Sequence, residues 1–127
     1  MAGLTKVESY LMDLNLSYQE LNEGTYFIND ETRGLPGVVV TIDDPVVIIR
    51  AKVMDMPKIV DPVLFKTLLT LNAAGVAHGA YAIEGDEIIL IDTLQFESMD
   101  KGDFEASIDS IGLALGEHYS VLGKFRN

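Results

Sequence analysis

The residues in this sequence best suited to chemistry are three carboxylates at a predicted hairpin turn, Glu84, Asp86 and Glu87. Two carboxylates placed together can do acid–base work when burial keeps one of them protonated while the other stays ionised. Gly85-Asp86 is typical of a tight hairpin turn, which places these side chains at a solvent-exposed tip. An enzyme that uses this trio is therefore one of three functional hypotheses, and solvated side chains at a turn are the simpler explanation.

The other reactive residue types lack the spacing that metal or nucleophilic chemistry needs. His78 and His118 are the two histidines, and neither has a second ligand at the short spacing of a zinc site. The sequence has no cysteine, which excludes a disulfide framework, thiol catalysis and a thiolate metal site. Neither a glycine-rich phosphate-binding motif nor a GxSxG motif is present. We therefore expect a protein that is not an enzyme, with no catalytic residue, no cofactor and no metal.

Charge and composition predict an acidic globular protein. Twenty Asp and Glu residues against nine Lys and Arg give a formal net charge of −11, which repels the phosphates of nucleic acids and anionic lipids. Hydrophobic residues make up 48% of the 127 residues, yet no apolar run approaches the roughly 20 residues of a membrane span. The first residues lack the basic-then-apolar pattern of a secretory signal. We expect a single domain over residues 1–127, cytoplasmic, without nucleic-acid or membrane partners.

Hydrophobic periodicity predicts the order helix, four strands, helix, two strands, helix. The predicted elements are helix Leu4–Leu14, a hairpin of Ser17–Leu21 and Thr25–Ile28, strands Val38–Ile42 and Val46–Val53, helix Pro62–Asn72, strands Ala80–Glu84 and Glu87–Gln95, and helix Phe104–Leu122. The strand Glu87–Gln95 is apolar on both faces, which predicts cover above and below it. Because tight turns join the long strands, the sheet is expected to be mainly antiparallel. The predicted fold class is α+β, a twisted antiparallel sheet flanked by three helices.

The helix predicted over Pro62–Asn72 is apolar around most of its circumference. Its polar interior positions are Lys66, Thr67 and Thr70. A helix with so little polar surface is buried on more than one side. In so small a protein this indicates a subunit interface or a bound partner. The candidate contact residues in this helix are Val63, Phe65, Leu69 and Leu71.

Two further features are candidates for binding. Met54 and Met56 flank a proline connector and would suit an adaptable groove, although core and loop methionine is the more common explanation. Gly112 and Gly116 lie inside the last predicted helix, where together they cost about 1–2 kcal/mol of helix propensity. That cost predicts a close approach of the helix to the sheet or to another helix. Glycines tolerated without a special contact are the alternative.

Three stretches of the sequence resemble the YbjN-type domain. A leucine-rich helix end, Leu68–Asn72, is followed by the hairpin segment Ala80–Leu90 and by the final helix Phe104–Leu122, with Tyr119 near its end. The YbjN family is in turn similar to the fold of type III secretion chaperones. Those are small, acidic, dimeric cytoplasmic proteins that hold an extended segment of an effector protein, and their second helix commonly forms the dimer interface. The resemblance spans about Lys6 to Leu122 and carries no catalytic residue.

The residues and the resemblance together favour a non-enzymatic, chaperone-like module that binds protein. It is expected to be a homodimer that captures an extended segment of a partner protein, by strand addition or in an apolar groove. The resemblance also leaves open a different class, a small-ligand sensor or sensory transduction regulatory domain. The sequence names neither the partner nor the ligand.

Overall fold

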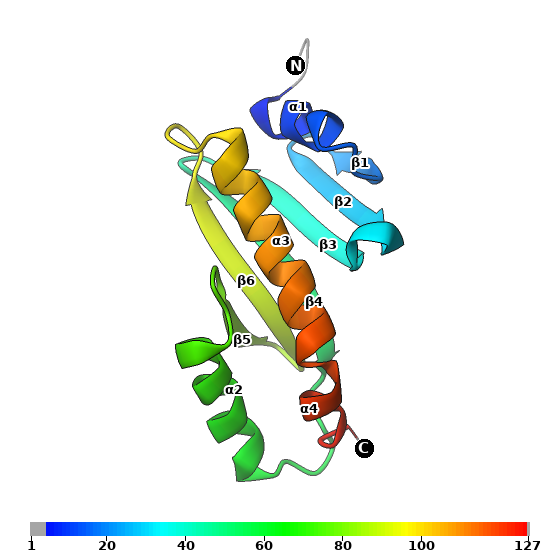
Figure 1. Ribbon diagram of the computed structural model, residues 1–127, viewed down its shortest axis with the longest axis vertical. Coiled ribbons are helices and arrows are strands. Elements are labelled where there is room, and N and C mark those ends of the chain that lie inside the picture. The colour runs from blue at the N-terminus through cyan, green and yellow to red at the C-terminus, as the bar shows by residue number, and fades with distance from the viewer. Residues whose placement is uncertain (1–4, 127) are drawn as a thin grey trace.

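The structure is a computed structural model that describes residues 5–126. Its elements in chain order are α1 (Lys6–Asp13), β1 (Tyr18–Asn22), β2 (Thr25–Asp30), the 3-10 turn η1 (Glu31–Arg33), β3 (Leu35–Asp43), β4 (Val46–Asp55), α2 (Pro62–Ala74), β5 (Ala80–Glu84), β6 (Glu87–Gln95), α3 (Lys101–Glu117) and α4 (Tyr119–Gly123). The predicted order of helices and strands is confirmed, with η1 and α4 as additions (Figure 1). Leu4, the predicted start of the first helix, lies outside the described residues.

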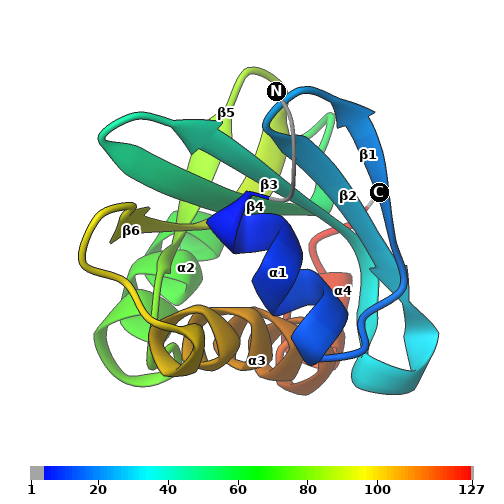
Figure 2. The ribbon, with the colours of Figure 1, turned by 90° about the horizontal axis from the view of Figure 1, so that it is seen from above.

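The described strands form one six-stranded sheet in the order β1-β2-β3-β4-β6-β5, and every neighbouring pair is antiparallel. The helices all lie on one face of this sheet, as Figure 2 shows. α3 crosses the middle of that face, α1 lies near β1, and α2 lies beside β5 (Figure 1). The predicted antiparallel, helix-flanked α+β fold is confirmed. Within residues 5–126, no helix has the length and hydrophobicity needed to cross a membrane.

The expectation that helices or other layers cover both faces of Glu87–Gln95 is wrong. The helix-free face of β6 carries Ile89, Ile91 and Thr93, of which Thr93 is exposed. Ile89 is nevertheless only 3% exposed. It lies between two cross-strand neighbours, Lys52 of β4 and Ala82 of β5, in the middle of three paired strands. Apolar residues on both faces of a strand can therefore reflect cross-strand cover as well as a second layer.

The core lies between the sheet and α3. Phe104, Ile108 and Ile111 of α3 are at most 1% exposed. The helix begins at a capping box in which the Asp100 carboxylate accepts from Asp103 N–H at 2.7 Å and the Asp103 carboxylate accepts from Asp100 N–H at 3.1 Å. These bonds satisfy backbone groups that a helix start leaves unpaired.

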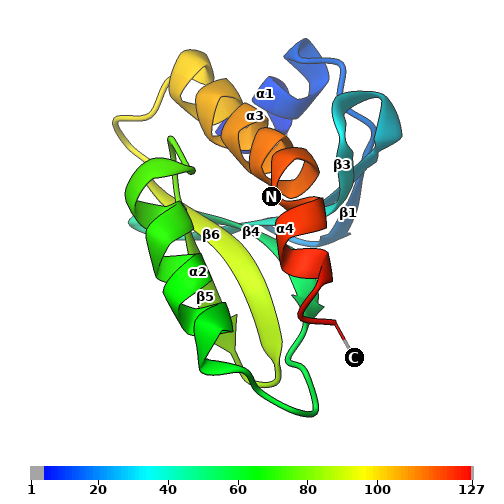
Figure 3. The ribbon, with the colours of Figure 1, turned by 60° about the horizontal axis from the view of Figure 1, so that its bottom comes forward.

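The last helix does not run unbroken from Phe104 to Leu122 as predicted. α3 ends at Glu117, and α4 continues from Tyr119 in a different direction (Figure 3). The break places His118 inside, at 7% exposed, and leaves Tyr119 outside, at 66% exposed. A hydrogen bond of 2.6 Å joins Nδ1 of His118 to the Tyr81 hydroxyl on β5. The regular apolar spacing predicted one continuous helix. The helix instead breaks at His118, where the polar His118–Tyr81 pair is buried.

Candidate binding surfaces

α2 leaves most of its large apolar side chains in solvent. It begins at Asp61, whose carboxylate accepts from Val63 N–H at 2.9 Å, and it buries Leu64 and Leu68 against the sheet. Three predicted contact residues are exposed: Val63 at 52%, Phe65 at 38% and Leu69 at 68%. We call these three side chains the α2 outer face. The fourth predicted residue, Leu71, is half-buried and packs against the core.

The connector before α2 adds to this exposed apolar surface. Ile59 is 81% exposed and Val60 is 41% exposed. On β5, beside α2, Ile83 is 51% exposed. Clusters of exposed apolar side chains on a water-soluble domain mark interaction sites. The helix that the sequence shows to be unusually apolar, α2, therefore keeps much of its apolar surface exposed to solvent.

The two candidate methionines do not share this surface. Met54 is 5% exposed and belongs to the core, and Met56 is half-buried against it. Together with Pro57 they border a recess of about 310 Å³ next to Arg126. Their side chains chiefly fill internal space at the end of β4.

The three carboxylates that prompted the enzyme hypothesis lie in solvent at the β5–β6 turn. The Glu84 carboxylate accepts two bonds from Arg50 Nη1, at 2.9 and 3.0 Å, and its side chain is 51% exposed. The Glu87 side chain is 43% exposed and pairs with Lys52, while Asp86 is exposed at the tip. The burial that a general acid needs is missing here.

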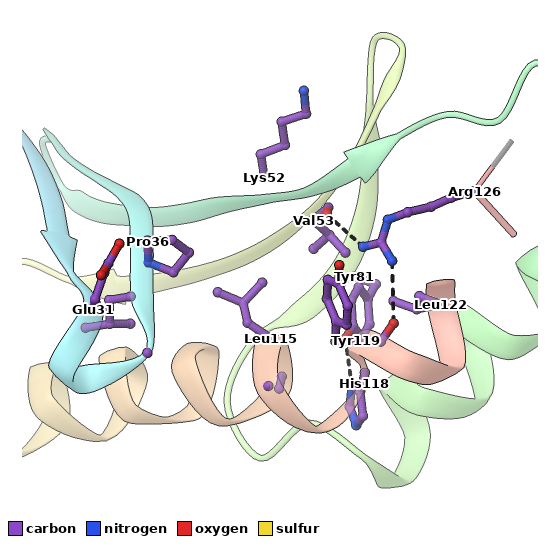
Figure 4. A pocket seen from close by; sticks show the side chains of 14 residues that line it. Glu31, Pro36, Lys52, Val53, Tyr81, Leu115, His118, Tyr119, Leu122 and Arg126 are labelled. Atoms are coloured by element: carbon purple, nitrogen blue, oxygen red, sulfur yellow. Dashed lines mark hydrogen bonds between the residues drawn. The ribbon is translucent and has the colours of Figure 1, made fainter. Parts of the chain in front are cut away.

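A pocket of about 540 Å³ opens where β3 and β4 separate. The pairing of β3 with β4 ends at Val38 and Ala51, and beyond this point residues 35–37 and 52–55 diverge. Val53 forms a bulge in the pairing of β4 with β6. The ends of α3 and α4 form the opposite wall (Figure 4). We call this cavity the α3–α4 pocket. Its lining includes the apolar residues Leu35, Val53, Ala114, Leu115 and Leu122 and the aromatic residues Tyr81 and Tyr119.

Polar groups of the α3–α4 pocket lie at its margins. Tyr81 is 6% exposed, and burial raises the pKa of its hydroxyl to about 12. This hydroxyl is bonded to His118, so the pair is internally satisfied. At one end, the Arg126 guanidinium lies 4.7 Å from the centre of the Tyr119 ring. Figure 4 shows it above Tyr119 and Tyr81, whereas the Lys52 side chain points away from the cavity.

Gly112 and Gly116, the two glycines of α3 that the sequence analysis singled out, differ in their surroundings. A Cβ added at Gly112 would lie 3.2 Å from the Arg33 carbonyl oxygen and 3.2 Å from Leu35 Cδ2, so the predicted close approach is confirmed there. A Cβ added at Gly116 would meet no atom within 4 Å. Gly116 lines the α3–α4 pocket, and the expectation of a close approach at this position is wrong. The sequence singled out Gly116 as unusual but predicted a contact there, not a cavity.

The structure has the fold of type III secretion chaperones and YbjN, an antiparallel sheet flanked by helices. The sequence matches the CesT_Tir_1 family over residues 2–127, and the chain belongs to this type III chaperone family. The resemblance found in the sequence is thereby confirmed. A comparison with curated proteins finds no match.

Solved structures share this fold at low sequence identity. A chain of the heterodimeric ExoU-SpcU complex from the type III secretion system of Pseudomonas aeruginosa superposes with a TM-score of 0.71 at 15% identity, covering 95% of this chain and 98% of that one. YbjN from E. coli gives a TM-score of 0.67 at 16% identity, with 94% and 93% covered. The HopA1-SchA chaperone-effector complex gives 0.65 at 8% identity, with 88% of each chain covered. At these identities the likeness is one of fold.

Proposed function

We propose that this protein is a non-enzymatic, chaperone-like homodimer of the cytoplasm that binds an extended segment of a partner protein. The observation that carries the proposal is the α2 outer face, which the rest of the chain leaves in solvent. Membership of a type III chaperone family supports it, as do solved structures of the same fold that are chaperone-effector complexes.

The α2 outer face suits contact with a second copy of the same helix. In a two-fold interface each copy presents the same patch, so the patch must complement itself. Phe65 and Leu69, four residues apart, lie on one side of α2 and can do so, because apolar groups need no specific partner. Val63 lies about 160° from Phe65 around the helix, on the side of Thr67 and Leu71. Full burial of one such side chain stabilises by about 1.5–3 kcal/mol. Val63, Phe65, Leu69 and the half-buried Leu71 are the proposed contact residues.

The extended segment is proposed to add as a strand to a free sheet edge. The two edge strands are β1 and β5, at opposite ends of the sheet. α2 lies beside β5, so a dimer formed through α2 occupies that end of the molecule. β1 is then the edge farther from the dimer contact. Strand addition there would supply main-chain hydrogen bonds that do not depend on the partner's sequence.

The dimer is tested by light scattering at tens of micromolar. Wild type should give twice the chain mass, and Leu69→Asp or Phe65→Asp should give the mass of one chain. Leu113→Asp is the matched control, because Leu113 is also a leucine exposed at 61% on a helix, but on α3. A monomeric wild type would end the dimer proposal, and a Leu113→Asp monomer would place the interface elsewhere.

Partner binding is tested by affinity capture from native lysate followed by mass spectrometry and limited proteolysis. A reproducible protein partner should protect a short extended segment from cleavage. Hydrogen exchange should slow along β1 when that segment is bound. Protection confined to the pocket lining, with a co-purified small molecule and no protein, would contradict strand capture and favour the sensor hypothesis.

A further inference from the structure

Gly116 keeps the α3–α4 pocket open at a cost to the helix. Glycine in a helix interior is less favourable than alanine by roughly 0.5–1 kcal/mol. Neither of the usual reasons for a helical glycine applies, because its φ is not in the left-handed region and no atom lies within 4 Å of the Cβ position. The remaining reason for a glycine here is that a larger side chain at position 116 would reach into the cavity that Gly116 lines.

The cavity has the size and lining of a small-molecule site. Its volume of about 540 Å³ lies within the roughly 300–1,000 Å³ of such pockets, which are apolar with a few polar groups that fix orientation. Leu35, Leu115 and Leu122 provide aliphatic wall from three elements. Because the Tyr81 hydroxyl already bonds His118, a ligand in the apolar part of the pocket need not supply a hydrogen-bond partner for it.

Among the described residues that line this pocket, Arg126 is the cationic side chain that lies over the cavity. Lys52 points away from it, and Glu31 lies at the opposite end of the pocket from Arg126 (Figure 4).

Nη1 and Nη2 of Arg126 donate to the carbonyl oxygens of Tyr119 and Val53, both at 3.5 Å, which is long for such bonds. Arg33 and Arg50 each pair with an acidic side chain, whereas no carboxylate within residues 5–126 pairs with Arg126. In a chain of net charge −11, this guanidinium retains donors for a stronger acceptor.

We infer that the α3–α4 pocket binds a small apolar monoanion, such as a medium-chain carboxylate. The head group takes a bidentate position on Arg126, and the tail lies between Leu35, Leu115 and Leu122. A guanidinium fork matches a carboxylate in geometry, and the apolar surroundings strengthen the pairing. This site is separate from the α2 outer face and from the strand edges, so it stands or falls independently of protein binding.

The test is isothermal titration of the full chain with decanoate, decanol and decyltrimethylammonium below their micelle concentrations. Decanoate should bind saturably at one site, at least tenfold more tightly than the other two. Arg126→Gln should remove this preference and leave decanol binding within twofold. Gly116→Leu should abolish binding of all three, because it fills the cavity. Leu69→Asp, on the α2 outer face, should change none of these affinities.

Two results would overturn the inference. One is equal binding of decanoate and the cationic analogue, or no binding of decanoate. The other is a folded Gly116→Leu protein, by circular dichroism, that retains decanoate affinity within twofold. Should Gly116→Leu fail to fold, the head-group preference and its loss in Arg126→Gln decide the question without it.

Discussion

α2 and α3 lie on the same face of one sheet, and both are rich in apolar residues, yet they use them differently. α3 buries six of its residues, including Phe104, Ile108 and Ile111, whereas α2 buries Leu64 and Leu68. The apolar face of α3 is completed by the chain's own sheet. On α2, Val63, Phe65 and Leu69 stay exposed to solvent. Hydrophobic composition alone does not separate these two kinds of helix.

The hydroxyl groups of the two helices show the same contrast. Ser107 on α3 donates to the Asp92 carboxylate at 2.7 Å, and Ser110 bonds the backbone of His78, so α3 reaches across to other elements. On α2, the Thr67 and Thr70 hydroxyls donate to carbonyl oxygens of their own helix at 2.8 and 2.7 Å. These two hydroxyls are thus satisfied within α2, whereas Asn72, near the end of the helix, bonds the Tyr81 backbone on β5 at 2.6 and 3.2 Å.

The largest expected effect is on the α3 side. Ile108→Ala removes a side chain that is 1% exposed and leaves a cavity. The free energy of unfolding should fall by about 2–5 kcal/mol in urea denaturation. A loss of less than 1 kcal/mol would mean that α3 is not the completed core helix described above, and the contrast with α2 would disappear.

Unfolding at alkaline pH tests the contact between Tyr81 on β5 and His118 at the end of α3. Burial raises the pKa of Tyr81 from about 10 to about 12, so the unfolded chain loses this proton first. Stability should be unaffected below pH 10 and should decline between pH 10 and 12, by about 2–3 kcal/mol for this group. Tyr81→Phe should flatten part of the decline. Other groups share the remainder. Burial and the Glu8 carboxylate raise the pKa of Tyr18 to about 12, burial raises the pKa of Tyr10 and Tyr26, and hydrogen bonds to Asp55 and Glu87 raise the pKa of Lys52.

Gly112 and Gly116, about one turn apart in α3, are compared by replacing each with alanine. Gly112→Ala should lower the free energy of unfolding by about 1–3 kcal/mol, because its Cβ would press on Arg33 and Leu35. Gly116→Ala should raise it by about 0.5–1 kcal/mol, because nothing opposes the better helix former. Thermal denaturation of both variants checks this, and shifts of the same sign would refute the distinction.

The smallest expected effect is on the α2 outer face. Leu69→Ser should change the free energy of unfolding by less than about 0.5 kcal/mol, because Leu69 is 68% exposed. The measurement is chemical denaturation at several protein concentrations, extrapolated to the monomer. A loss comparable to that of Ile108→Ala would show that this leucine supports the monomer's own core.

Local signals in the sequence accounted for most of the fold. Asp61 and Asp100 mark helix starts, and alternating apolar runs with tight turns mark the hairpins. The apolar composition of α2 predicted burial on more than one side; within the chain the helix buries Leu64 and Leu68, and an interface over its other residues stays a prediction. These features depend on residues close together in the chain, which is why they can be read from a single sequence.

The break at His118 and the α3–α4 pocket could not be foreseen in this way. The break depends on Tyr81, far away in the sequence, and the pocket combines segments from β3, β4 and the last two helices. Gly112 and Gly116 have the same residue type and lie in the same helix, yet one permits a contact and the other preserves a space. Only the position of η1 against α3 distinguishes them.

The strand order also determines when each strand can pair during translation. β6 pairs with β4, yet α2 and β5 come between them in the chain. On the ribosome, β1 to β4 can form consecutive hairpins as they emerge, but the second edge of β4 has to wait roughly seconds for its partner. Until then the nascent chain carries an unpaired strand edge together with the apolar α2 segment, and both invite association with other chains.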